Sequence, residues 1–131
     1  MKTFKKSILA LGLAVGVMAG MCGAAVNAAQ TQSATLSGVS VIGSSDITYS
    51  KGTAYTTCGG YGGSVSVSST YYYCNTRNGS SGHRSNGAGD SRSAGVGFSA
   101  PTNCKSVSIS GSHKFYYNGQ TWSATTFDDK E

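Results

Sequence analysis

Over most of its length the chain alternates between apolar and polar residues with a period of two, the pattern of β-strands that bury one face. In the run from 65 to 73, two valines, a serine and two tyrosines share one parity, and mostly small hydroxyl residues share the other. A similar run starts at Ala94. Another starts at Val107 and keeps its phase to Tyr117, as one long strand bent at Gly111 would. The pattern predicts several strands, each with a core face and a solvent face.

Asn118-Gly119, between two β-rich runs, is typical of a two-residue type I′ hairpin. Counting outward from this turn places Phe115 opposite Trp122, with His113 on the same face. Because that face carries the large aromatic residues, we expect it to be the core. His113 is then expected to be a hydrogen-bonded structural histidine.

Two stretches interrupt the alternation. At Ser37-Gly38 the apolar positions change parity, as a β-bulge within one strand would cause. Residues 75–92 are polar, rich in glycine and serine, and far longer than an ordinary connection between strands. We expect them to form a long flexible loop.

Composition narrows the fold class. Serine, threonine and glycine dominate beyond residue 28, while leucine, methionine and glutamate, which favour helices, are nearly absent there. Tyrosines and the single tryptophan supply buried area that the few aliphatic residues do not. We therefore expect an all-β domain.

Residues 1–28 have the features of a secretory signal peptide. Three early lysines precede an uncharged apolar stretch from Ile8 to Val26, and small residues precede a cleavage site between Ala28 and Ala29. We expect residues 29–131 to be a single secreted domain that acts outside the cell.

The net charge of +5 comes largely from this leader. Three of the ten Lys and Arg residues lie there, which leaves seven basic against five acidic residues in the rest of the chain. So small an excess, with no run of basic residues, argues against nucleic acid or an anionic membrane as a partner.

Loss of Cys22 with the leader leaves Cys58, Cys74 and Cys104, so at most one internal disulfide can form. If the strand that starts at Ala94 returns antiparallel to the run from 65 to 73, it carries Cys104 back toward Cys58. We therefore favour a Cys58–Cys104 disulfide, with Cys74 free or intermolecular, over a Cys74–Cys104 disulfide.

The sequence offers little for catalysis or for a cofactor. His83, Asp90 and a nearby serine can be combined on paper into a catalytic triad, but serine is so common here that its presence near a histidine carries no information. No strained nucleophile turn and no Cys-x-x-Cys or His-x-x-x-His spacing is present. We expect a protein that is not an enzyme, with no catalytic residue, no metal and no cofactor.

Exposed tyrosines and cations are better candidates for function. Alternation turns Tyr72 outward between two inward tyrosines, and it places Tyr116 beside Lys114 on the face opposite the core. The candidate ligand-binding residues are Tyr72, Arg84, Arg92, Lys114 and Tyr116.

Four segments of the C-terminal half carry a resemblance to a known family. They are Tyr71-Tyr72-Tyr73, Gly82-His83-Arg84-Ser85, Arg92-Ser93-Ala94-Gly95-Val96-Gly97-Phe98-Ser99-Ala100 and His113-Lys114-Phe115-Tyr116-Tyr117-Asn118. In order and spacing they resemble the lactococcin 972 family of secreted bacteriocins. The resemblance implies a small sandwich of two antiparallel sheets and non-enzymatic action outside the cell. It also implies binding to the cell-wall precursor lipid II, and this binding would block septum building.

Two other functions fit the same composition. One is a secreted adhesin or glycan-binding β-sandwich that binds a cell-surface glycan without killing the cell. The other is a Ser/Gly/Tyr-rich extracellular matrix protein that self-associates, as a homodimer or further, through a cysteine or an edge strand. Growth inhibition, glycan binding and self-association distinguish the three.

Overall fold

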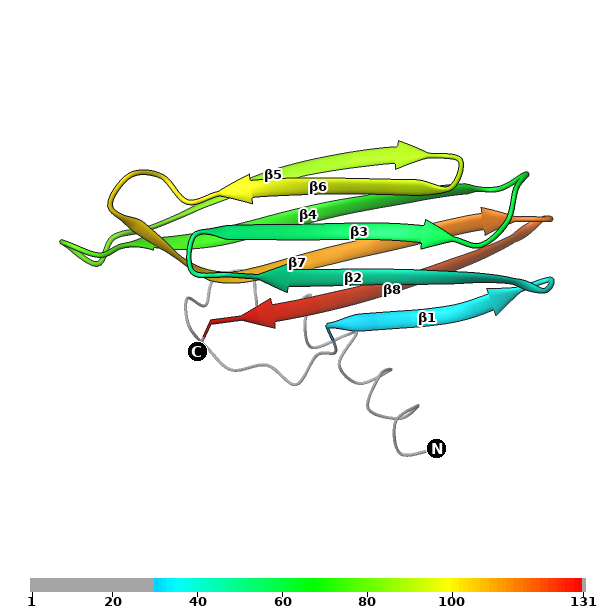
Figure 1. Cartoon of the computed structure of the whole chain (residues 1–131), viewed down its shortest axis with the longest axis horizontal. Helices are drawn as coiled ribbons and strands as arrows, with labels where there is room; N and C mark the ends of the chain where they lie inside the picture. The colour runs from blue at the N-terminus through cyan, green and yellow to red at the C-terminus, as the bar shows by residue number, and fades with distance from the viewer. Residues whose placement is uncertain (1–29, 131) are drawn as a thin grey trace, which may run out of the picture.

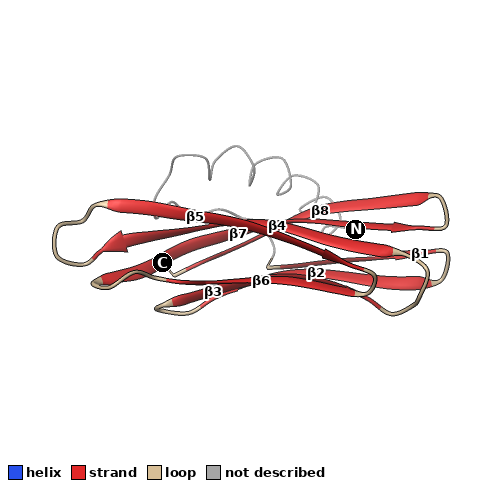
Figure 2. Cartoon of the chain, turned by 90° about the horizontal axis from the view of Figure 1, so that it is seen from above, coloured by secondary structure: helices blue, strands red, loops and turns tan. Residues whose placement is uncertain are grey.

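The computed structural model describes residues 30–130, so the predicted signal peptide and its cleavage site at Ala28 and Ala29 lie outside the described residues. The described chain is all-β: two antiparallel four-stranded sheets pack face to face as a small sandwich (Figures 1 and 2). The strands are β1 (Thr31–Leu36), β2 (Val39–Ile47), β3 (Lys51–Cys58), β4 (Ser64–Asn75), β5 (Ser81–Asp90), β6 (Ser93–Ser99), β7 (Cys104–Tyr117) and β8 (Gln120–Asp129). Sheet A has the order β1-β2-β3-β6, and sheet B has the order β5-β4-β7-β8.

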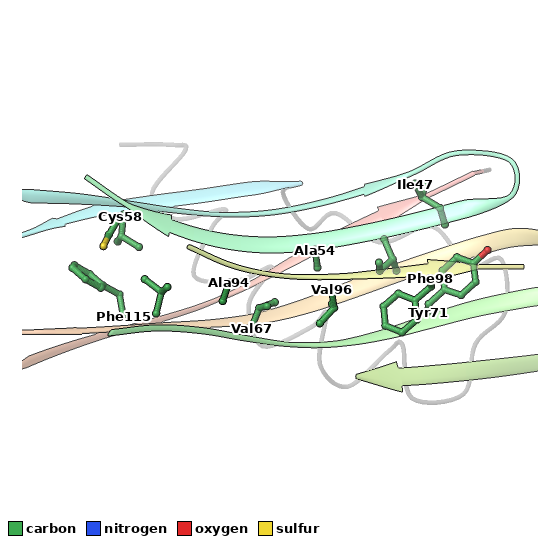
Figure 3. Packing of buried hydrophobic residues seen from close by; sticks show 12 residues of the cluster. Ile47, Ala54, Cys58, Val67, Tyr71, Ala94, Val96, Phe98 and Phe115 are labelled. Carbon is green, nitrogen blue, oxygen red and sulfur yellow. The ribbon is translucent and has the colours of Figure 1, made fainter. Parts of the chain in front are cut away.

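The core lies between the two sheets and is built from the apolar parity of each strand. In Figure 3, Ala54 and Val96 of sheet A face Val67 of sheet B. The ring of Tyr71 stacks on Phe98 with 5.4 Å between the ring centroids. Because small and aromatic side chains fill this space together, a chain with few aliphatic residues can still bury a continuous core.

The predicted hairpin is confirmed. Asn118 and Gly119 have φ values of 53° and 76°, as a type I′ turn requires, and Phe115 pairs with Trp122 across β7 and β8. Phe115 is fully buried, while Trp122 is partly buried and packs against the core cluster. The turn therefore determines which face of both strands lies inside.

His113 is fully buried between the sheets within a chain of hydrogen bonds. Thr56 Oγ1 donates to the carbonyl oxygen of Ser66 at 2.9 Å, so it accepts from Nδ1–H of His113 at 2.8 Å. His113 Nε2 then accepts from Thr126 Oγ1 at 2.7 Å, and Thr126 Oγ1 accepts from Ser45. Each buried polar atom of this chain is thereby paired, and the imidazole is neutral with its proton on Nδ1.

The predicted β-bulge at Ser37-Gly38 is wrong. Ser37 and Gly38 have φ values of 47° and 83° and form the turn between β1 and β2, so the change of parity marks a new strand. The predicted long strand through Gly111 is confirmed as β7, whose register with β4 shifts opposite Tyr72 and Tyr73. A tight turn and a bulge both change the parity, which is why the sequence did not separate them.

The predicted flexible loop over residues 75–92 is also wrong, because most of it is the edge strand β5. The chain reverses between β4 and β5 where Asn75 Oδ1 accepts hydrogen bonds from the backbone N–H groups of Arg77 and Asn78, and where Gly79 has a φ of 76°. Strand β5 then pairs with β4 along its whole length. Most of its residues are exposed, so this strand forms without the alternation of apolar and polar residues that marks a buried face.

The expected neighbour of the strand that starts at Ala94 is wrong as well. Strand β6 pairs with β3 in sheet A, whereas β4 pairs with β7 in sheet B. Asn75 therefore lies opposite Cys104, at the far end of β4 from the turn that follows Cys58. Cys74 lies opposite Lys105, so its side chain and that of Cys104 point to opposite faces of sheet B. No disulfide joins the three cysteines in the structure.

We expect the purified protein to contain no Cys58–Cys104 disulfide. The twelve residues of β4 separate the two cysteines, and twelve extended residues span about 40 Å, whereas a disulfide needs Cα atoms within about 7 Å. Peptide mapping of protein alkylated without reduction measures this linkage. A major Cys58–Cys104 peptide would contradict the strand order of sheet B.

Candidate functional site

Lys114 and Tyr116 lie on the outer face of sheet B, near the end where β7 turns into β8. Alternation about the buried Phe115 directs both side chains away from the core. Lys114 lies opposite Ser66 and Tyr116 lies opposite Ser64 on β4. Tyr116 is 52% exposed, so its ring is available to a ligand.

A second tyrosine and a second cation lie at the same end of the sandwich. The guanidinium carbon of Arg92 lies 4.3 Å from the ring centroid of Tyr61. Arg92 is held at this end because its carbonyl oxygen accepts from the backbone N–H of Cys58 at 2.8 Å. Tyr61 lies in the turn between β3 and β4, and this turn packs closely on β7. A Cβ added to Gly63 of the same turn would lie only 2.6 Å from the carbonyl oxygen of Tyr116.

We name these four residues the tyrosine–cation cluster: Tyr61, Arg92, Lys114 and Tyr116. The Arg92 guanidinium lies over the Tyr61 ring in a cation–π contact, and a guanidinium carries several N–H donors that can bind an acceptor. This end of the sandwich thus exposes two tyrosine rings and two cations, on the outer face of sheet B and on the neighbouring turns. Such a surface suits a ligand that carries both sugar rings and phosphate oxygens.

Sequence reasoning missed Tyr61, although a signal was present. It lies between two Gly-Gly pairs, in a segment that the sequence indicates only as a turn. A short glycine turn has no apolar neighbours that could cover an aromatic ring. Tyr61 is 76% exposed, the highest value among the large hydrophobic residues between 30 and 130.

Tyr72 forms a separate aromatic pair on the same outer face. Its ring centroid lies 5.7 Å from that of His83, which stands opposite it on β5. Tyr72 pairs with Ser108, and Lys114 lies six residues further along β7, so the two positions are about 20 Å apart. Tyr72 therefore contributes to the same face but not to the tyrosine–cation cluster.

Arg84, another candidate residue from the sequence, lies on a different face from Lys114 and Tyr116. It lies opposite Tyr71, on the side of β5 that faces sheet A, and its guanidinium carbon is 5.9 Å from the ring centroid of Tyr73. The sheet itself separates Arg84 from the outer face. The predicted flexible loop left the direction of Arg84 undefined, whereas pairing of β5 with β4 determines it.

The buried histidine is sealed from any ligand. Burial lowers the pKa of His113 to about 4, because no water reaches the ring to solvate the charged form. Within residues 30–130 no three His, Cys, Asp or Glu side chains come close enough to hold a metal ion. In the described part of the chain, no helix is long and apolar enough to span a membrane.

Comparison with known proteins gives no assignment. The chain matches no protein-family description, and no curated protein matches it.

Proposed function

We propose that this chain is a secreted, non-enzymatic, bacteriocin-like protein that binds the cell-wall precursor lipid II through the tyrosine–cation cluster and so inhibits the growth of related bacteria. The observation that carries the proposal is that Tyr61, Arg92, Lys114 and Tyr116 all lie at one end of the sandwich, where they expose two tyrosine rings and two cations. The resemblance of four segments to the lactococcin 972 family supports it.

The chemistry of lipid II matches this cluster. The molecule presents a pyrophosphate and sugar rings at the membrane surface. The Arg92 guanidinium can bind phosphate oxygens in a bidentate manner, and Lys114 adds a second charge on the neighbouring face. Exposed tyrosine rings such as Tyr61 and Tyr116 provide flat contact area for sugars at little entropic cost.

We expect the purified protein to bind vesicles that contain lipid II and not otherwise identical vesicles without it. Alanine at Arg92 or Tyr116 should raise the dissociation constant by about tenfold, because each change removes one donor or one ring from the ligand contact. Binding is measured by vesicle co-sedimentation, and growth inhibition is measured with the same variants. Unchanged thermal melting shows that each variant is folded.

Arg77→Ala and Tyr49→Ala are the matched controls. Arg77 lies in the exposed turn between β4 and β5, and Tyr49 is 63% exposed in the turn between β2 and β3, both at the opposite end of the sandwich. Neither change should alter binding. Equal binding to both kinds of vesicle would reject lipid II as the ligand, while binding to isolated cell-wall glycans without growth inhibition would favour the adhesin.

A further inference from the structure

Strand β5 is an edge of sheet B, so only one side of it pairs with another strand. The N–H of Asn75 donates to the carbonyl oxygen of Ser80 at 2.7 Å, which sets the phase of the ladder. Even-numbered residues of β5 therefore point their backbone groups toward β4, and the odd-numbered residues His83, Ser85, Gly87 and Gly89 point theirs outward. Gly87 lies within this outward series.

This edge lacks the features that usually prevent strands from pairing with another chain. Between Ser81 and Asp90 there is no proline and no lysine, and the register with β4 runs without a bulge. The strand is ten residues long and exposed along most of its length. Such an edge is a template for one more strand.

The opposite lateral side of the sandwich differs, because side chains of the edge strand β8 bond to sheet A and to the turn that follows β1. Ser37, in the turn that follows β1, donates to Gln120 Oε1 of β8 at 2.9 Å. Asp128 of β8 accepts from the N–H of Ile47 at 2.9 Å, which places a carboxylate inward at that edge. An inward carboxylate is one of the features that discourage strand addition, and β5 has none between Ser81 and Gly89.

We propose that β5 binds a second copy of this chain, with the two β5 strands antiparallel about a two-fold axis at Gly87, so that the two sheets B form one continuous eight-stranded sheet. This register places Arg84 opposite Asp90 of the second copy, and the symmetry repeats the pair. Both residues are exposed and lie on the same face of β5. These are the strand's only arginine and only carboxylate, so this register satisfies both charges at once.

The backbone chemistry agrees with this register. Gly87 faces itself across the axis, and Ser85 faces Gly89 of the second copy, so the outward groups can form about six hydrogen bonds. The N–H of Gly87 is held at 2.8 Å by Oδ1 of Asn86 in the single chain. In the pair, the carbonyl oxygen of Gly87 from the second copy replaces that side chain, and the two glycines leave the approach free of bulky groups.

Sedimentation velocity over a range of concentrations, with the cysteines kept reduced, tests the pairing. We expect a reversible dimer. Arg84→Asp and Asp90→Arg each place like charges opposite one another and should raise the dimer dissociation constant by about tenfold. The double variant restores opposite charges and should return the constant to near that of the original protein. Arg77→Asp, which makes the same change outside the strand, should leave it unchanged.

A disulfide tests the register directly. Gly87→Cys should link two chains on mild oxidation, because residue 87 faces its own copy across the axis. Gly89→Cys is the matched control: its two copies are four residues apart along the strands, about 13 Å, and should not link. The linked peptides are identified by mass spectrometry, which separates them from products of the native cysteines.

Three results would overturn the proposal. One is a monomer at every concentration tested. Another is a dimer whose dissociation constant is the same in Arg84→Asp and in Asp90→Arg as in the original protein. The third is Gly89→Cys linking as readily as Gly87→Cys. None of these results depends on whether the chain binds lipid II.

Discussion

The free energy of unfolding should fall by about 2 kcal/mol when the pH is lowered from 7.5 to 5. Burial lowers the pKa of His113 from 6.5 to about 4 in the folded chain. Between these two values the unfolded chain binds a proton that the folded chain does not, so stability is complete above pH 6.5 and is lost as the pH falls toward 4. Across the whole range the loss approaches about 3 kcal/mol.

The physical cause is the hydrogen-bond chain around the ring. Protonation would place a second donor on Nε2, which now accepts from Thr126 Oγ1 at 2.7 Å. The residues packed on the ring from the neighbouring strands are Gly43, Ser45, Thr56, Gly111 and Thr126. None of these carries a carboxylate that could stabilise an imidazolium.

Urea unfolding at pH 7.5 and pH 5 measures this loss, in a range where most carboxylates are still ionised. His113→Leu should be less stable at both pH values, but its stability should change much less between them. His83→Ala removes an exposed histidine, and this variant should still lose about 2 kcal/mol of stability between pH 7.5 and pH 5. An unchanged pH dependence in His113→Leu would show that another group is responsible.

Gly43→Ala should destabilise the domain by about 3 kcal/mol. A Cβ at this position would overlap Cγ of His113 and lie 2.7 Å from Nδ1. The ring cannot move away, because Thr56 and Thr126 hold its two nitrogens and a Cβ built on Gly111 would already be 2.7 Å from Nε2. Overpacking of this kind costs about 1 to 3 kcal/mol, and loss of the buried hydrogen bonds adds to it.

Gly95→Ala is the matched control on another strand of sheet A. A Cβ there would meet Tyr55 Cβ at 3.5 Å, an ordinary contact on the outer face. The substitution should change stability by less than about 0.5 kcal/mol, or increase it slightly because glycine is unfavourable within strands. Urea unfolding at pH 7.5 compares the two variants. Equal losses would mean that the contact with His113 is not the cause.

Sequence reasoning named three of the four residues of the tyrosine–cation cluster and gave the direction of two. Lys114 and Tyr116 could be predicted to lie outward because their directions follow from the Asn118-Gly119 turn and from alternation along one strand. Arg92 could be named but not placed, and its contact with Tyr61 depends on how two connections fold. The conformation of a loop depends on the residues it packs against, and loop residues show no periodic pattern from which that packing could be predicted.

The sequence by itself determined the all-β class, the hairpin register and the face to which Phe115, His113 and Tyr72 turn. Each of these follows from geometry within one strand or one turn, where the period of two leaves no other choice. Only the tertiary structure decided that β6 joins sheet A, that β5 is a strand, and that Cys58 and Cys104 lie at opposite ends. Backbone hydrogen bonds are alike for any pair of strands, so the choice of partner depends on how the whole core packs.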